Sequence, residues 1–161
     1  MYVPLLARTV LGLGAEGFGF LMASLGVGAV AGALTVGMLG SREPPLAQLF
    51  VSAMIAFASL LSLAATRHVW MAVPLLFVTG YFGIMLMASC NTSMQLRAPD
   101  ALRGRVMSLY TWVSGGIFPI GALLVGTISQ WWGVSAAFLW NGVLGLAVLT
   151  MIMLWWRRRG K

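Results

Sequence analysis

The chain has 161 residues, of which 60% are hydrophobic and 8% are charged, and its mean hydropathy is +0.95. A soluble domain usually has about 45–50% apolar and roughly 25% charged residues, so this composition excludes an ordinary soluble fold and predicts an integral membrane protein. The formal charge of +7 does not indicate a nucleic-acid partner, because the basic residues stand in short gaps between apolar runs instead of clustering with aromatic residues on a polar surface.

Apolar runs predict five membrane-spanning helices in chain order. Residues 1–17 are interpreted as the end of a truncated helix followed by a periplasmic turn, which suggests that the chain lacks its beginning. Each later run is long enough, at about 1.5 Å per residue, to cross a hydrocarbon core about 30 Å thick. None contains an ionisable Asp, Glu, Lys, Arg or His, so we expect no proton relay or ion site within them. The predicted spans are residues 18–39, 46–66, 69–90, 106–129 and 134–156, and residues 157–161 form a basic tail.

Glycine and proline mark where these helices pack or bend. Gly28 and Gly32 form a GxxxG motif, and small residues at this spacing let another backbone approach closely. Ordinary helix packing is favoured over a dedicated dimer interface, because the motif is frequent in membrane helices. Pro74 and Gly80 are expected to interrupt the third span. A simple bend of the helix is favoured there over a role in gating. In the fourth span the expected packing glycines are Gly115, Gly116 and Gly121.

The polar stretch from Gln95 to Val106, QLRAPDALRGRV, separates the third and fourth spans. Ala98-Pro99-Asp100 is typical of a helix start, and Arg103 stands three residues after Asp100, where an exposed ion pair can form. Counted over the loops, eight basic residues stand on one side of the predicted membrane and two on the other. Because cytoplasmic loops carry an excess of Lys and Arg, this stretch and the C-terminus are predicted to be cytoplasmic. The eight are Arg42, Arg97, Arg103, Arg105, Arg157, Arg158, Arg159 and Lys161.

The sequence offers little for catalysis or metal binding. It has one cysteine, Cys90, and one histidine, His68, so the chain can form neither an internal disulfide nor a cluster of cysteine and histidine ligands. Its three carboxylates stand in three separate loops, where no pair at helical spacing could bind a metal or act as acid and base. We therefore expect no enzyme, no metal site and no cofactor.

Within the spans only neutral polar side chains remain. Serine and threonine in membrane helices usually bond to a carbonyl one turn back in their own helix, and this is the expectation for each of them. Asn141 costs more to bury, so we expect it to reach a neighbouring helix rather than a substrate.

Three segments carry a family resemblance. They are QLRAPDALRGRVMSLY, the GGxxPxG pattern from Gly115 to Gly121, and the turn WWGV. Together they resemble the carboxyl-terminal half of a major facilitator superfamily transporter, in the exporter group that includes the enterobactin exporter and macrolide-efflux proteins. The run GAEGFGFLMASLGVGAVAGAL is similar to the segment that leads into and forms the eighth helix of that group. The resemblance covers essentially the whole chain, and the P-x-x-x-R-G-R element is its most specific part.

The resemblance implies an all-α transmembrane fold whose five spans correspond to helices 8 to 12 of a twelve-helix transporter. In that family two six-helix halves surround a midplane site and rock against each other, giving alternating access. The implied partners are the lipid bilayer, a small-molecule substrate such as a drug or siderophore, and an amino-terminal six-helix half that this chain lacks. A proton gradient is the implied driving force, the bacterial inner membrane the implied location, and the chain is expected to be a fragment inactive by itself.

The resemblance also implies roles for residues. The start of helix eleven would belong to the cytoplasmic gate, and helices eight, ten and eleven would approach the central cavity. The gate candidates are Arg97, Pro99, Asp100, Arg103, Gly104 and Arg105, and the cavity candidates are Ser24, Thr79, Tyr81, Tyr110, Trp112 and Ser114. The competing hypothesis is a small membrane scaffold that oligomerises through its glycine faces without transport, whereas a lipid-modifying enzyme would need carboxylates that the chain does not have.

Overall fold

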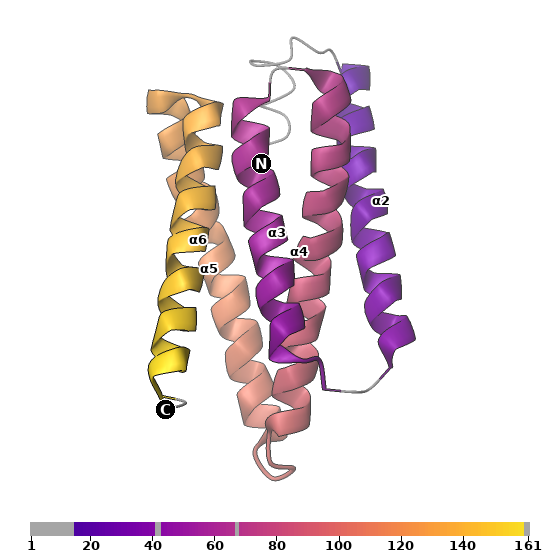
Figure 1. The fold of residues 1–161 in the computed structure, drawn as a ribbon, viewed down its shortest axis with the longest axis vertical. Helices are drawn as coiled ribbons and strands as arrows, with labels where there is room; N and C mark the ends of the chain where they lie inside the picture. The colour runs from indigo at the N-terminus through magenta and orange to yellow at the C-terminus, as the bar shows by residue number, and fades with distance from the viewer. Residues whose placement is uncertain (1–14, 41–42, 67, 160–161) are drawn as a thin grey trace.

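The computed structural model describes residues 15–40, 43–66 and 68–159, and these residues form five long helices that run up and down in turn (Figure 1). All five are long and apolar enough to cross a membrane, which confirms the all-α transmembrane fold expected from the sequence. Most of the expected N-terminal helix end, in residues 1–14, lies outside the described residues, as do Arg42 and Lys161 of the basic count. The helices are α2 (Ala15–Leu39), α3 (Leu46–Ala65), α4 (Val69–Arg97), α5 (Arg103–Trp132) and α6 (Val134–Arg159).

Two helices extend beyond their predicted apolar spans into the polar stretch between them. Helix α4 continues to Arg97, and the Gln95 side-chain amide donates to the side-chain oxygen Oδ1 of Asn91 one turn earlier. The helix ends there because Pro99 disfavours the helical conformation for the residue before it, and Ala98 is extended, with φ −72° and ψ 128°. The polar stretch is therefore only partly a loop, with residues 98–102 connecting the two helices.

The helix start expected at Ala98-Pro99-Asp100 is wrong by about one turn. Pro99 opens a tight turn, in which the Leu102 N–H donates to the Pro99 carbonyl at 2.9 Å, and α5 begins at Arg103. Because its carbonyl accepts this bond, Pro99 holds the first position of the turn, and sequence pattern alone does not separate such a turn from a first helical turn.

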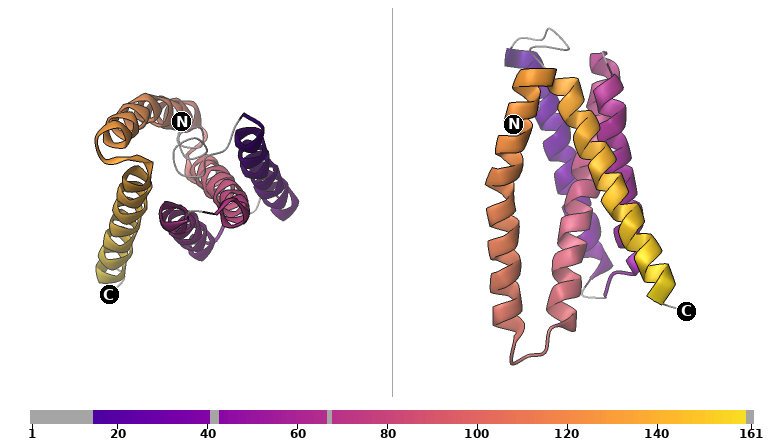
Figure 2. Two further views of the ribbon diagram at one scale, coloured as in Figure 1. Left: turned by 90° about the horizontal axis from the view of Figure 1, so that it is seen from above. Right: turned by 90° about the vertical axis from the view of Figure 1, so that its left-hand side faces the viewer.

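Glycine closes two of the other turns. Gly40, with φ +71°, follows the end of α2, and Gly133, with φ +83°, separates α5 from α6. Both have a positive φ, which residues other than glycine rarely adopt, so the chain can reverse at once. At Gly133 a single residue joins two membrane-length helices, which therefore lie next to each other at that end (Figure 2).

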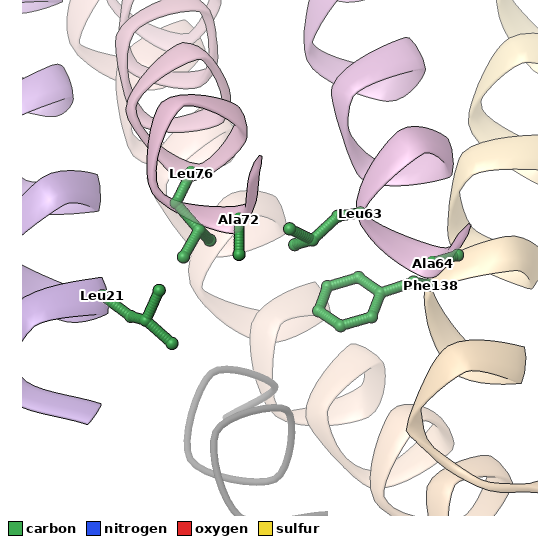
Figure 3. Packing of buried hydrophobic residues seen from close by; sticks show 6 residues of the cluster. All are labelled: Leu21, Leu63, Ala64, Ala72, Leu76 and Phe138. Carbon is green, nitrogen blue, oxygen red and sulfur yellow. The ribbon is translucent and has the colours of Figure 1, made fainter. Parts of the chain in front are cut away.

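Helix α4 is the centre of the packing, with α2 on one side and α3 on the other. Helix α3 in turn packs against α6, and α6 against α5, whereas α4 and α5 touch only slightly although they are consecutive. A buried hydrophobic cluster joins four helices at the end where α4 begins (Figure 3). It consists of Leu21, Leu63, Ala64, Ala72, Leu76 and Phe138, and it includes no residue of α5.

Helices α2 and α4 approach each other through glycine. A Cβ atom added at Gly28 would overlap the carbonyl oxygen of Phe77, and one added at Gly32 would overlap that of Tyr81. From the other side, a Cβ at Gly80 would overlap the carbonyl oxygen of Leu25. The expectation that Pro74 and Gly80 interrupt this helix is wrong, because α4 is continuous through both. Gly80 instead lets the α2 backbone come close.

Candidate functional site

The turns that join α2 to α3 and α4 to α5 lie at the same end of the bundle as the end of α6 (Figure 1). This end carries the arginines of the predicted gate. The Arg97 Nε group donates to the Glu43 carboxylate at 2.5 Å, joining the end of α4 to the segment that precedes α3. Both side chains are largely exposed, 63% and 45%, so the pair stabilises by at most about 1 kcal/mol and is weakened by salt. It makes this end of the bundle a polar, charge-paired surface.

The remaining gate candidates do not converge on one point. Arg103 Nη2 lies 2.7 Å from Asp100 Oδ1, which is the ion pair expected from their spacing. Gly104 and Arg105 are exposed, and neither ion pair found among the described residues includes Arg105. Pro99 lies in the turn itself. This arrangement can attract anionic groups or meet another protein surface, but the described residues hold no group of three or more side chains suited to a metal ion.

Three of the cavity candidates lie in contacts between helices α2, α3 and α4. Each of their hydroxyl groups has a partner on a neighbouring helix. The Ser24 hydroxyl donates to the Val73 carbonyl at 2.7 Å, Thr79 lies 2.8 Å from the Ser59 hydroxyl, and the Tyr81 hydroxyl lies 3.0 Å from that of Thr35. These hydroxyls therefore bridge helices within the bundle. The bond expected within its own helix is present for Thr79, whose hydroxyl also lies 2.8 Å from the Leu75 carbonyl, and the tertiary contact with Ser59 adds a second partner.

The other three candidates stand on α5 and are separated from the first group. Trp112 is 81% exposed, and Tyr110 is half-buried. The Ser114 hydroxyl donates to the Tyr110 carbonyl at 2.6 Å, one turn back in its own helix, as expected for a serine in a membrane helix. The structure thus does not bring the six candidates into one cavity, and their role in a substrate site stays a prediction.

A groove that the sequence did not reveal lies between α3, α4 and α6. Its upper part, the part farther from the basic end, has a volume of about 530 Å³. This part reaches from Leu46 to Phe57 on α3 and from Asn141 to Ile152 on α6. A second part of about 460 Å³ extends to Arg97 and Pro99 at the basic end. The two parts share the wall residues Leu46, Leu49 and Cys90, so we treat them as one groove.

This groove, called the α3–α6 groove below, is mostly apolar but not entirely so. Asn141 lines its upper part, and the Asn141 side-chain amide bonds to the Ala137 carbonyl of its own helix at 3.4 Å. Ser93 lines its lower part, and the Ser93 hydroxyl oxygen is buried without a hydrogen-bond partner among the described residues. The groove exists because α6 leaves α5 after the Gly133 turn and crosses toward α3 (Figure 2). No periodicity in the sequence encodes that crossing.

Comparison with known proteins finds a matching family and similar curated proteins. A family model described as transmembrane secretion effector matches residues 1–159. Two curated proteins, both named enterobactin exporter EntS, from Escherichia coli O1:K1 / APEC and from Escherichia coli O45:K1 (strain S88 / ExPEC), are 30% identical to the chain over 145 residues. The match covers 88% of this chain and 35% of each relative, so the chain spans about a third of their length. No solved structure matches the chain.

Proposed function

Because the chain belongs to the transmembrane secretion effector family of the major facilitator superfamily, which comprises transporters, we propose that it is part of a secondary active exporter of a small molecule. The observation that carries this proposal is the family match along residues 1–159, with five membrane-length helices over the described residues. Membership in this family indicates a transporter rather than an enzyme. The location that follows is the bacterial inner membrane, in which the chain is a multi-pass protein.

The proposed mechanism is alternating access between this group of helices and a second, amino-terminal group. Two observations support a partner of this kind. The chain corresponds to about a third of the length of its relatives. Helix α5 contributes nothing to the buried cluster and leaves Trp112 exposed, which suits a helix that packs against another part of a larger transporter. In this proposal the chain needs that partner for transport.

The basic end of the bundle is proposed to face the cytoplasm, with the C-terminus on the same side. The excess of arginine in the loops at this end supports the orientation. Arg97, Asp100, Arg103 and Arg105 would then belong to the cytoplasmic gate, where charged surfaces of the two halves meet as that side closes. Arg105 is the strongest candidate for a contact with the second half, because it belongs to neither ion pair of the described residues.

The driving force is proposed to be the proton gradient, and the substrate a drug-like or siderophore-like molecule. The name of the two relatives supports a siderophore, because both are called enterobactin exporters. The predicted spans contain no ionisable side chain, so the groups that bind the coupled proton would have to lie in the second half.

The competing scaffold hypothesis needs glycine faces that are open to another copy. On α2 that face is not open, because Gly28 and Gly32 are covered by the α4 backbone of the same chain, whereas Gly115, Gly116 and Gly121 of α5 are uncovered within the described residues. No observation in the described residues favours it over transport.

A chimeric exporter tests the proposal. The chain replaces the matching segment of the Escherichia coli enterobactin exporter, in cells that lack the native exporter, and secreted enterobactin is measured. Everted membrane vesicles then measure uptake of enterobactin and of a panel of lipophilic drugs, with and without a protonophore. We expect uptake that the protonophore abolishes. The chain without the other helices, expressed to the same level, is the control and should show none.

A chimera that reaches the membrane in normal amounts but transports none of these compounds contradicts the assignment. Uptake that persists in the presence of the protonophore contradicts only the proposed driving force. Transport by the chain without the other helices contradicts the need for a second half.

A further inference from the structure

The α3–α6 groove has the length of one leaflet of a bilayer. Leu46 and Phe57, which mark its ends on α3, are 11 residues apart, as are Ile152 and Asn141 on α6. At about 1.5 Å per residue this is about 16 Å, close to half of a hydrocarbon core about 30 Å thick. The groove is therefore long enough for one acyl chain that enters from the basic end, and its walls offer mainly hydrocarbon.

The mouth of the groove offers hydrogen-bond donors and positive charge. Arg97 lines it, and the pair with Glu43 uses the Nε group of Arg97, so the two Nη groups of the guanidinium can bind a second acceptor. The buried Ser93 hydroxyl, which has no partner among the described residues, lines the same part. Arg105 precedes the wall residue Val106 and is exposed. A planar guanidinium is well suited to bind phosphate.

We propose that the α3–α6 groove binds one anionic phospholipid from the leaflet at the basic end, with an acyl chain along α3 and α6 and the phosphate at Arg97. Apolar walls of one-leaflet length select a lipid chain over a compact solute, and the cationic mouth selects an anionic headgroup over a zwitterionic one. The bound lipid fills the space that α6 leaves as it separates from α5. This role is independent of transport, since it concerns a structural lipid.

Lipid retention by the purified chain tests the proposal. The chain is held in neutral detergent micelles that contain either dioleoyl phosphatidylglycerol or dioleoyl phosphatidylcholine, and native mass spectrometry counts the lipids that remain bound. We expect one retained phosphatidylglycerol, favoured over phosphatidylcholine by about tenfold, the effect of roughly one charge-assisted hydrogen bond. Arg97→Gln should remove this preference, and Cys90→Trp, which places a ring in the shared wall, should abolish retention of both lipids.

Two matched variants control for charge and bulk. Arg158→Gln removes an arginine from an exposed position at the same end, and Ala58→Trp adds the same ring at an exposed position of α3; neither residue lines the groove. Both should retain phosphatidylglycerol as the wild type does. Equal retention of the two lipids by the wild type overturns the proposal, and so does a loss with Arg158→Gln as large as that with Arg97→Gln, which would indicate diffuse attraction. A lipid-free dimer would overturn it in favour of a second copy of the chain.

The single cysteine supplies a readout that does not depend on whether Cys90→Trp folds. Cys90 lines both parts of the groove, so a bound acyl chain should cover it. We expect alkylation of Cys90 by a membrane-permeant maleimide to be several-fold slower in phosphatidylglycerol than in phosphatidylcholine, and this protection to disappear in Arg97→Gln. Equal alkylation rates of the wild type in the two lipids overturn the proposal.

Discussion

Helices α2 and α5 both carry closely spaced glycines, yet they lie in different surroundings. The α2 glycines Gly28 and Gly32 lie against the α4 backbone, so closely that an added Cβ atom would overlap it. At Gly115, Gly116 and Gly121 of α5, the described residues place no other atom within 4 Å of an added Cβ. A glycine-rich face therefore shows that a close neighbour is possible, but it does not show which neighbour is present.

The same contrast extends to the bundle as a whole. Helices α2, α3 and α4 form a packed unit, with glycine contacts and hydroxyl bridges such as that between Thr35 and Tyr81. Helix α5 contacts mainly α6, and most of its surface is open. The packing of α2, α3 and α4 follows from contacts within this chain. The open surface of α5 is the surface that the proposed second half would cover. Four substitution pairs test this difference.

The largest effect is expected where helix backbones touch. Gly80→Leu should destabilise the chain by about 1–3 kcal/mol, because its side chain has no space against the α2 backbone and the helices must move apart. The free energy of unfolding can be measured by sodium dodecyl sulfate titration in mixed micelles, followed by circular dichroism. Gly116→Leu is the matched control on α5 and should not destabilise the isolated chain. Equal losses in the two variants would mean that α5 is packed as closely as α2.

Gly116→Leu, the control for the isolated chain, should be harmful in the assembled exporter. In the enterobactin exporter chimera, Gly116→Leu should lower export about tenfold, which corresponds to roughly 1.4 kcal/mol, because the proposed second half needs close approach to α5. Export per unit of membrane-inserted protein is the measurement. Leu123→Ile, an exposed substitution of equal volume on the same helix, should leave export unchanged. Normal export by Gly116→Leu would show that this face of α5 meets lipid.

A smaller effect is expected from the hydroxyl bridges. Thr79→Val should cost about 0.6 kcal/mol, because besides the bond to the Leu75 carbonyl of its own helix it removes the 2.8 Å contact with Ser59 on α3, while keeping the side-chain shape. Thr127→Val on α5 should change stability little, since the bonds of the Thr127 hydroxyl within the described residues go to the Leu123 and Leu124 carbonyls of its own helix. The same titration measures both variants. If Thr127→Val costs as much as Thr79→Val, the cost arises from the local helix and not from the bridge.

The smallest effects are expected at the exposed ion pairs. Glu43→Gln should cost about 0.2–1 kcal/mol at low salt and less at high salt, because the pair with Arg97 is exposed. The double variant with Arg97→Gln should cost no more than either single change. Asp100→Asn, which breaks the pair between Asp100 and Arg103 on one turn, should cost about 0.2–0.5 kcal/mol. Costs that simply add in the double variant would show that Glu43 and Arg97 do not interact.

Local signals in the sequence were sufficient for much of the fold. Apolar runs of membrane length predicted five helices, and the spacing of Asp100 and Arg103 predicted their ion pair. The helix ends were less predictable, because Pro99 is compatible with both a turn and a first helical turn, and polar residues such as Asn91 continued α4. The pair between Glu43 and Arg97 was not foreseen, since these residues are 54 positions apart and only the folded chain brings their loops together.

The sequence by itself determined that the chain lies in a membrane, how many described helices cross it, and which end carries the arginines, because composition, length and charge act through local chemistry. Only the tertiary structure decided which glycines are covered, that Ser24, Thr79 and Tyr81 bridge helices, and that a groove remains between α3 and α6. These features depend on the crossing of helices far apart in the chain, and an apolar helix suits many neighbours equally well. Close backbone contact and hydroxyl pairing select one arrangement among them.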